Sequence, residues 1–345
     1  MVQPASSLTL PQPGRQSESA VARTLAFLGP DFTLFLLFLS IFIALAITYG
    51  AHFHLLGEGS IAIAGGLAGG LIGIRFLYRA RSIVLDQGDA RAEFYAASRR
   101  ILRDWGPMIL LVVLFENLHA YTGLIREQPI DDSLYKLDVA VFGVEPSVWV
   151  GKHLSTPLLT DWFTIAYGLY FILPMTLAFA LTMRARRHDF RELATSVVLH
   201  LCIGFLFFII FPAGPPRFYE PLVAHGGFEP AHLTSLTGLW EWSQSAWDSA
   251  NPVRDHSSFP SMHCAIAMMT LLYGRRFGSA VFPNRPRLFY YLCLPLVVSL
   301  WCSTIYLRHH WVPDCVAGML LGVICYHVTP ILRRYWPGAE AAART

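Results

Sequence analysis

The sequence predicts an all-α protein, a polytopic bundle of about eight membrane-spanning helices. Hydrophobic residues make up 54% of the 345 residues and charged residues only 14%, whereas about a quarter of the residues in soluble domains are charged. In addition, eight stretches are apolar over about 20 residues, the length with which a helix crosses the hydrocarbon core of a bilayer. These predicted spans are 32–50, 60–79, 106–125, 161–183, 194–213, 259–276, 288–307 and 314–332.

The spans and the segments between them divide the chain into four parts. Residues 1–30 are polar and rich in Ser, Pro and Gln, which predicts a disordered cytoplasmic tail. Residues 31–104 hold two accessory spans followed by a basic cytoplasmic segment. Residues 105–335 hold the other six spans and form the main membrane domain, and residues 336–345 form a second cytoplasmic tail.

The basic residues orient the predicted bundle. Of the 26 Lys and Arg residues, 20 fall in the N-terminal tail, in the C-terminal residues from 333 onward and in the connections 75–103, 184–191 and 275–287, which are all predicted to lie on one side of the membrane. Short cytoplasmic loops of membrane proteins are enriched in Lys and Arg. The sequence therefore predicts an integral multi-pass membrane protein, in the cell membrane if the source is bacterial, with both termini in the cytoplasm.

Composition also narrows the choice of partners. The net charge of +3 is small and spread along the chain, so no basic patch suggests nucleic-acid binding. The six Cys residues stand in or next to apolar stretches without a CxxC spacing, which indicates buried thiols. We expect no metal or other cofactor, and the sequence leaves the oligomeric state open.

Three polar patches stand at span ends that this topology places on the extracytoplasmic face. The first is 212-PAGPPR-217, after the fifth span, and the second is 257-SSFPSMH-263, at the start of the sixth. The third is 303-STIYLRHHWVPDCVAG-318, between the seventh and eighth spans. Because all three lie at one membrane depth, we expect them to form a single polar pocket.

The prolines of the first two patches indicate how this pocket is built. Pro215 and Pro216 predict an extended segment that supports Arg217, whose planar guanidinium suits phosphate oxygens. Pro260 predicts the first turn of a helix, with Ser258 as a cap. The free backbone N–H groups of such a helix start favour an anion.

The third patch adds a candidate nucleophile. Pro313 predicts another helix start, and His310 and Asp314 are four residues apart, which would place them on one face. A carboxylate that binds one ring nitrogen fixes the tautomer and leaves the other nitrogen free to attack. Attack by His310 on phosphorus, with His263 protonating the leaving oxygen and arginines neutralising charge, would be phosphoryl transfer without a metal.

The sequences PPR, FPSMH and HxxxD in the three patches resemble the signature motifs of the type 2 phosphatidic acid phosphatase superfamily, with roughly forty residues between successive patches. The chain is most similar to the branch of inositol phosphorylceramide synthases and related inositolphosphotransferases, and the segment 131-DDSLYKLDVAVFGVEPSVW-149 also resembles that branch. The resemblance covers about residues 105–333. It implies a six-helix phosphatase-type catalytic core, membrane lipids as substrates and no metal cofactor.

The resemblance also implies roles for single residues. His310 would be the nucleophile that forms a phosphohistidine, and Asp314 would orient it. His263 would be the general acid and base, while Ser261 and Arg217 would bind the substrate phosphate.

The chain departs from the superfamily pattern at two positions. Ile210 stands where the pattern has Lys, and Thr304 stands where it has Arg. Arg308, two residues before the nucleophile, is the candidate for the missing phosphate-binding charge, and His309 is expected to be an interfacial neighbour. These departures favour a transferase that moves an inositol-phosphate-like headgroup from a phospholipid donor to a lipid or polyol acceptor.

Other functions stay open. With water as the acceptor, the same residues would make a lipid phosphatase acting on phosphatidate or polyprenyl diphosphate. A non-catalytic transporter or scaffold is an alternative of another class, although no inverted repeat is evident. Glu116 and His119 of the third span have the ExxH spacing of di-iron helix bundles. About three turns of helix separate Glu116 from the outer pocket, so the two are secondary candidates for a polar contact or a wall of the substrate cleft.

Overall fold

The computed structural model describes residues 19–50, 90–115, 117–118, 121–227, 233–250 and 256–337. Among these residues the structure is helical and has no strand, which confirms the all-α prediction. The elements in chain order are α1 (Ala20–Tyr49), α3 (Ala90–Phe115), α4 (Asp131–Phe142), α5 (Pro146–Leu154), α6 (Pro157–Met183), α7 (Arg187–Ile210), η2 (Pro216–Phe218), α8 (Glu220–Ala224), α9 (Leu239–Ala250), α10 (Met262–Phe277), η3 (Gly278–Ala280), α11 (Leu288–Tyr306) and α12 (Val312–Arg334).

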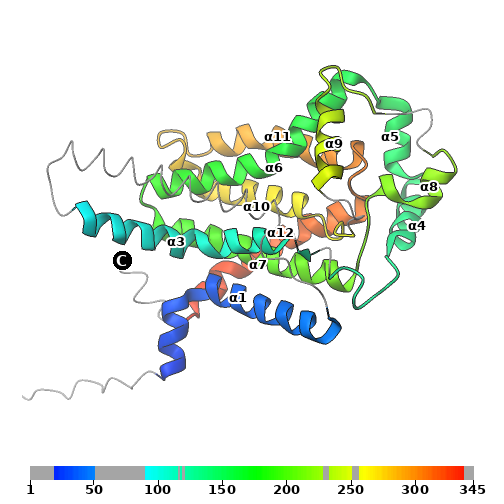
Figure 1. The fold of residues 1–345 in the computed structure, drawn as a ribbon. Helices are drawn as coiled ribbons and strands as arrows, with labels where there is room; N and C mark the ends of the chain where they lie inside the picture. The colour runs from blue at the N-terminus through cyan, green and yellow to red at the C-terminus, as the bar shows by residue number, and fades with distance from the viewer. Residues whose placement is uncertain are drawn as a thin grey trace, which may run out of the picture.

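The long helices lie side by side around α10, while the short helices gather at one end of the bundle. Helix α10 packs against α6, α7, α11 and α12, and α1 and α3 pack against α7. The short helices α4, α5, α8 and α9 cover one end of this arrangement (Figure 1). We call this end the capped end and the other the opposite end.

The apolar composition of the helices matches a membrane protein. Among the described residues, α1, α6, α7, α11 and α12 are long and apolar enough to cross a membrane. They correspond to the predicted spans 32–50, 161–183, 194–213, 288–307 and 314–332. The predicted span 259–276 corresponds to α10, which has 16 residues and is largely buried in the centre of the bundle. The predicted span 60–79 lies outside the described residues, so the number of spans stays a prediction.

The first helix begins earlier than the sequence indicated. Helix α1 starts at Ala20, so residues 20–30, which we expected to belong to a disordered tail, are helical. The hydroxyl of Ser19 accepts the backbone N–H of Ala22 at 3.1 Å and so caps the helix. Gly29, at φ 72°, and the following Pro30 break the direction of the helix without ending it (Figure 1). Such a Gly–Pro kink resembles a helix end in the sequence.

The third predicted span, 106–125, differs from the helix that the structure shows. Helix α3 begins at Ala90 and ends at Phe115, and turns follow it. Leu118 and Tyr121 lie in these turns and are nonetheless buried in the core. Their apolar character reflects burial rather than helix, which explains the error. Glu116 and His119 lie outside the described residues.

Close packing of α12 on α10 determines the geometry of the capped end. Gly318 and Gly322 of α12 form a G-x-x-x-G pattern, which lets two membrane helices approach closely. A Cβ atom at Gly318 would collide with the carbonyl of Ser261, and one at Gly322 would collide with the carbonyl of Ala265. The two glycines therefore set the start of α10 directly against the first turns of α12.

Candidate functional site

Backbone hydrogen bonds join the three polar patches of the sequence at the capped end. The N–H of Ala213 donates to the carbonyl of His256 at 3.0 Å, and the N–H of Ser258 donates to the carbonyl of Ala213 at 2.8 Å. These bonds fix the first patch beside the second. The N–H of Ser261 donates to the carbonyl of Asp314 at 2.9 Å, which fixes the second patch beside the third. The pocket expected from the topology therefore forms.

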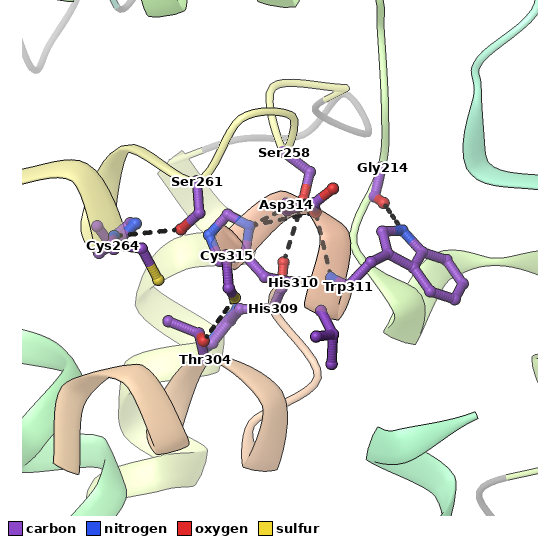
Figure 2. A network of polar contacts seen from close by, with 12 residues as sticks. Gly214, Ser258, Ser261, Cys264, Thr304, His309, His310, Trp311, Asp314 and Cys315 are labelled. Carbon is purple, nitrogen blue, oxygen red and sulfur yellow. Dashed lines mark hydrogen bonds and ion pairs between the residues drawn. The ribbon is translucent and has the colours of Figure 1, made fainter. Parts of the chain in front are cut away.

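Helix α4 supports this junction with two carboxylates. The buried indole of Trp311 donates to the carbonyl of Gly214 at 2.9 Å and joins the third patch to the first (Figure 2). Asp131 accepts the N–H of Gly214 at 2.8 Å, and Asp138 accepts the N–H of Val312 at 3.2 Å. Burial raises the pKa of Asp131 to about 6 and that of Asp138 to about 7. The segment 131–149 thus supports the loops that carry the candidate catalytic residues.

His310 lies in a shared hydrogen-bond system with Asp314 and Ser258 (Figure 2). Its Nδ1 is 3.4 Å from Oδ2 of Asp314. The Ser258 hydroxyl donates to the same Oδ2 at 2.7 Å and lies 3.0 Å from Nδ1 of His310. The backbone N–H of Trp311 also donates to Oδ2, at 3.1 Å. Because Nδ1 faces these acceptors, the other ring nitrogen, Nε2, is the one that can attack a substrate.

The two serines of the second patch differ from their predicted roles. We expected Ser258 to cap the sixth span, but α10 begins at Met262 and its N-cap is Ser261, whose hydroxyl accepts the N–H of Cys264 at 3.3 Å. Ser261 is fully buried, and it is not among the residues that line the cavity described below. Pro260 precedes the helix instead of forming its first turn, which moves the cap from Ser258 to Ser261 and leaves Ser258 to bind the Asp314 carboxylate.

His263 lies beside His310 in an aromatic stack. The centroids of the two imidazole rings are 5.7 Å apart. Tyr167 of α6 stacks on His263 at 4.3 Å and on His309 at 4.5 Å. Burial, followed by the charge of Arg217, lowers the pKa of His309 well below its usual range. His309 thus lines the cavity beside His310, and its expected place at the membrane interface stays a prediction.

The two predicted arginines occupy different places. Arg217 lines the cavity, and its Nη1 donates to Oε1 of Gln244 on α9 at 2.6 Å. Arg308 is 8% exposed, has a φ of 60° and is not among the lining residues. Burial lowers the pKa of Arg308 to about 10, and the nearby carboxylate of Glu145 acts in the opposite direction. Of the two, Arg217 is the one whose side chain faces the cavity, and a phosphate-binding role for Arg308 stays a prediction.

The two departures from the superfamily pattern also have structural outcomes. Ile210 is 42% exposed at the end of α7. Thr304 shapes the loop that carries the candidate nucleophile, because its carbonyl accepts the N–H of His309 at 2.9 Å and the N–H of His310 at 3.1 Å. Its hydroxyl lies 3.1 Å from Sγ of Cys315 (Figure 2).

The three patches border a cavity of about 570 Å³ whose lining has an apolar part and a polar part. The apolar part comes from side chains of α3, α6 and α7, and the polar part contains candidate catalytic residues. The apolar part includes Val112, Phe115, Ile165, Leu169, Ile172, Leu201, Phe205 and Phe208. The polar part includes Arg217, Gln244, Ser258, His263, His309 and His310.

The cavity also involves residues that sequence reasoning did not assign to the site. Trp240, Trp242, Ser243 and Gln244 of α9 line it. Tyr167 belongs to the apolar span 161–183, where a tyrosine gives no distinguishing signal. Within the described residues no group of three or more His, Cys, Asp and Glu side chains could hold a metal ion.

Comparison of the chain with known proteins identifies its family. A family model described as the PAP2 superfamily matches residues 133–328. The chain is 30% identical over 175 residues to the catalytic subunit of inositol phosphorylceramide synthase from Schizosaccharomyces pombe, a match that covers 49% of this chain and 40% of that protein.

Two further relatives carry similar names. The corresponding catalytic subunit from Saccharomyces cerevisiae is 26% identical, over 58% of this chain and 51% of that protein. The inositol phosphorylceramide synthase of Candida albicans is 25% identical, over 56% of this chain and 42% of that protein. The chain thus spans about half or less of the length of these curated relatives. No solved structure matches the chain significantly.

Proposed function

The chain belongs to the PAP2 superfamily, and from this premise we propose that it transfers an inositol-phosphate-like headgroup between lipids through a phosphohistidine on His310. The observation that carries the proposal is the His310–Ser258–Asp314 arrangement beside a cavity with a mostly apolar lining. Pockets that bind small molecules are mostly apolar, with a few polar groups that fix the orientation of the ligand. A lipid matches this lining, with its phosphate at the histidines and its tails in the apolar part.

The first half of the reaction transfers the headgroup to the protein. Nε2 of His310 attacks phosphorus and forms an N–P bond, while the P–O bond to the glycerol of the donor lipid breaks. His263 gives a proton to the departing oxygen. The positive charge that develops on the His310 ring is stabilised by the Asp314 carboxylate, which the Ser258 hydroxyl and the Trp311 N–H hold in place.

The second half regenerates the enzyme. Neutral His263 accepts a proton from the hydroxyl of the acceptor lipid, whose oxygen attacks phosphorus, and the N–P bond to His310 breaks. The centroids of the two rings are 5.7 Å apart, and both imidazoles line the same cavity. Arg217, on the cavity wall, is placed to neutralise charge on the other phosphate oxygens. No step requires a metal.

An apolar groove on the bundle surface supports a lipid substrate. Trp105 of α3 and Phe171, Ile172, Met175, Thr176 and Phe179 of α6 line this groove. Phe171 and Ile172 also line the cavity, so an apolar surface continues from the outside of the bundle toward the site. We infer that lipids enter between α3 and α6. The names of the curated relatives also favour lipid transfer over hydrolysis.

The orientation in the membrane completes the proposal. The distribution of Lys and Arg favours cytoplasmic termini and therefore an extracytoplasmic capped end. Fusing the C-terminus to a reporter that is active only in the cytoplasm tests this arrangement. The reporter is expected to be active, and an inactive but expressed fusion would reverse the orientation.

The function is tested by supplying purified protein with defined lipids. The donor is phosphatidylinositol, the acceptor is ceramide or diacylglycerol with distinguishable chains, and mass spectrometry detects the products. We expect a new inositol-containing phospholipid whose formation needs both donor and acceptor. Phosphate released from phosphatidate or polyprenyl diphosphate without any acceptor, and no transfer product, would instead establish a phosphatase.

A further inference from the structure

Helix α9 forms a wall of the cavity that the proposed chemistry does not use. Trp240, Trp242, Ser243 and Gln244 of this helix all line the cavity. The Gln244 amide oxygen accepts a hydrogen bond from Arg217, the residue placed to bind phosphate. Whatever group is attached to the phosphate on the side of α9 would therefore lie directly against these side chains.

The position of α9 is fixed by buried contacts. Asp161 of α6 is 6% exposed and accepts the backbone N–H groups of Leu236 and Thr237, both at 3.1 Å, and the Thr237 hydroxyl at 3.0 Å. Trp240 packs against Tyr306 and its neighbours at the end of α11. These contacts hold α9 against α6 and α11, and the part of the helix with Ser243 and Gln244 faces the cavity.

The hydrogen-bonding groups on this face complement hydroxyl groups. Because Arg217 occupies the amide oxygen of Gln244, the NH₂ group of that side chain is the part that can donate to a substrate oxygen. The Ser243 hydroxyl donates to the carbonyl of Trp240 at 2.8 Å, so its lone pairs can accept a proton from a substrate hydroxyl. The wall therefore offers a donor and an acceptor side by side.

Trp242 and the charges of the cavity limit the kinds of headgroup that would bind here. The Trp242 side chain is 68% exposed although it lines the cavity, and its indole offers a flat apolar face for the C–H face of a ring. Among the described residues that line the cavity there is no Asp or Glu, whereas Arg217 brings a positive charge. This part of the lining therefore disfavours a cationic headgroup relative to an uncharged one.

We propose that α9 is a headgroup-recognition site for an uncharged polyol, with Trp242 stacking on the ring and Ser243 and Gln244 binding its hydroxyls. This inference rests on the proposed function, since it assigns the part of the donor lipid that the transfer reaction carries. A site built to hydrogen-bond a substrate hydroxyl discriminates strongly against ligands that lack it. The α9 wall therefore determines which phospholipid is the donor.

The test is lipid binding, which does not depend on turnover. The full-length protein in detergent is titrated with phosphatidylinositol, phosphatidylcholine and phosphatidate of identical chains, and native mass spectrometry gives the three Kd values. We expect phosphatidylinositol to bind at least about tenfold more tightly than the other two, the equivalent of one good hydrogen bond. Trp242→Ala and Gln244→Ala are each expected to reduce this preference to below about threefold.

Matched controls separate recognition from general damage. Trp149→Ala on α5 removes a tryptophan that is 45% exposed and is not among the lining residues, and Gln128→Ala removes an exposed glutamine in the turn before α4. Both are expected to keep the preference. If Gln244→Ala weakens all three lipids equally, Gln244 acts only through Arg217 and the recognition role is wrong.

The remaining outcomes of this experiment also test the inference. Absence of a preference in the wild-type protein, a preference for phosphatidylcholine, or a preference that survives both α9 substitutions would overturn the inference. A preference for phosphatidylinositol without acceptor-dependent transfer would contradict the proposed function and leave the binding site intact. Transfer activity without a preference for phosphatidylinositol would contradict the recognition role of α9 and leave the proposed function intact.

Discussion

The two ends of the bundle both bury carboxylates, but they bind them in different ways. At the opposite end the partners are arginines. Asp31 pairs with Arg103 at 2.9 Å and with Arg191 at 3.3 Å. Two further pairs, Asp104 with Arg187 and Glu192 with Arg276, repeat the arrangement. These ion pairs neutralise the carboxylates and join α1, α3, α7 and α10.

At the capped end, neutral groups hold the carboxylates. Asp314 accepts a hydroxyl, a backbone N–H and the imidazole of His310, and Asp138 accepts the backbone N–H of Val312. Neutral donors position a carboxylate without cancelling its charge. In the proposed reaction the charge of Asp314 is thus available to the imidazolium that forms. The difference indicates that the ion pairs of the opposite end hold the helices together, whereas the carboxylates of the capped end suit the proposed chemistry.

The largest effect is expected from His310→Ala, and the adjacent His309 is its control. His310→Ala removes the nucleophile, so the rate of headgroup transfer should fall by about 10⁴ or more. His309→Ala removes a ring that stacks on Tyr167, so its rate should stay within about tenfold of wild type. Initial rates in lipid nanodiscs measure both. Equal losses would undermine the assignment of His310.

Replacing one carboxylate at each end of the bundle tests this difference directly. Asp314→Asn should lower kcat by about 10²–10⁴ with little change in Tm, because the amide keeps the shape but not the charge. Asp31→Asn should cost about 3 kcal/mol of stability, because Arg103 and Arg191 lose their buried partner.

The two readouts are kcat per folded protein and Tm. We expect the Asp31 variant to keep its kcat and lose stability. If Asp31→Asn impairs chemistry and Asp314→Asn only lowers Tm, the division between the two ends is wrong.

Ser258→Ala should give a smaller loss, about tenfold in kcat, because Asp314 keeps the N–H of Trp311 and the Nδ1 contact of His310. The dependence of kcat on pH should also change, since the hydroxyl lies 3.0 Å from Nδ1 of His310. Ser133→Ala on the exposed face of α4 is the matched control. An increase in KM alone, with an unchanged kcat and pH profile, would exclude a positioning role for Ser258.

The smallest effect is expected from Asp138→Asn and depends on pH. Burial raises the pKa of Asp138 from 3.8 to about 7. Between these values the folded protein keeps a proton that the unfolded chain has released, so this group lowers stability as the pH rises from about 4 to about 7. The asparagine carbonyl can still accept the N–H of Val312 and has no proton to lose. From pH 5 to pH 7.5, Tm should fall by about 1–3 °C less in the variant than in wild type. An identical decrease would show that Asp138 does not titrate in this range.

The sequence predicted those features of the fold that depend on composition and on the order of elements. Four predicted spans correspond closely to α6, α7, α11 and α12, because a long apolar run has few alternatives to a membrane helix. The meeting of the three patches followed from the topology, which brings alternate span ends to one side. Pro313 indicated the start of α12 correctly, since proline is favoured in the first turn of a helix.

Features that depend on tertiary contacts were not predictable. Ser258 lies 56 residues from Asp314, and only the bridge of Ala213 to the second patch places its hydroxyl against the carboxylate. Sequence reasoning assigned no role to Asp131 and Asp138 individually, because their partners are backbone N–H groups that leave no mark in the sequence. The contribution of α9 to the cavity depends in the same way on the contact of Asp161 with the turn before it.

The most direct test of the central claim is to trap the covalent intermediate. Wild-type protein is mixed with phosphatidylinositol without acceptor, quenched under conditions that preserve phosphohistidine, digested, and analysed by mass spectrometry. The account predicts the mass of the phosphoinositol group on His310, its loss when acceptor is added before quenching, and its absence from His310→Ala. Turnover without any modified peptide, or modification of His263 or another residue in place of His310, would contradict it.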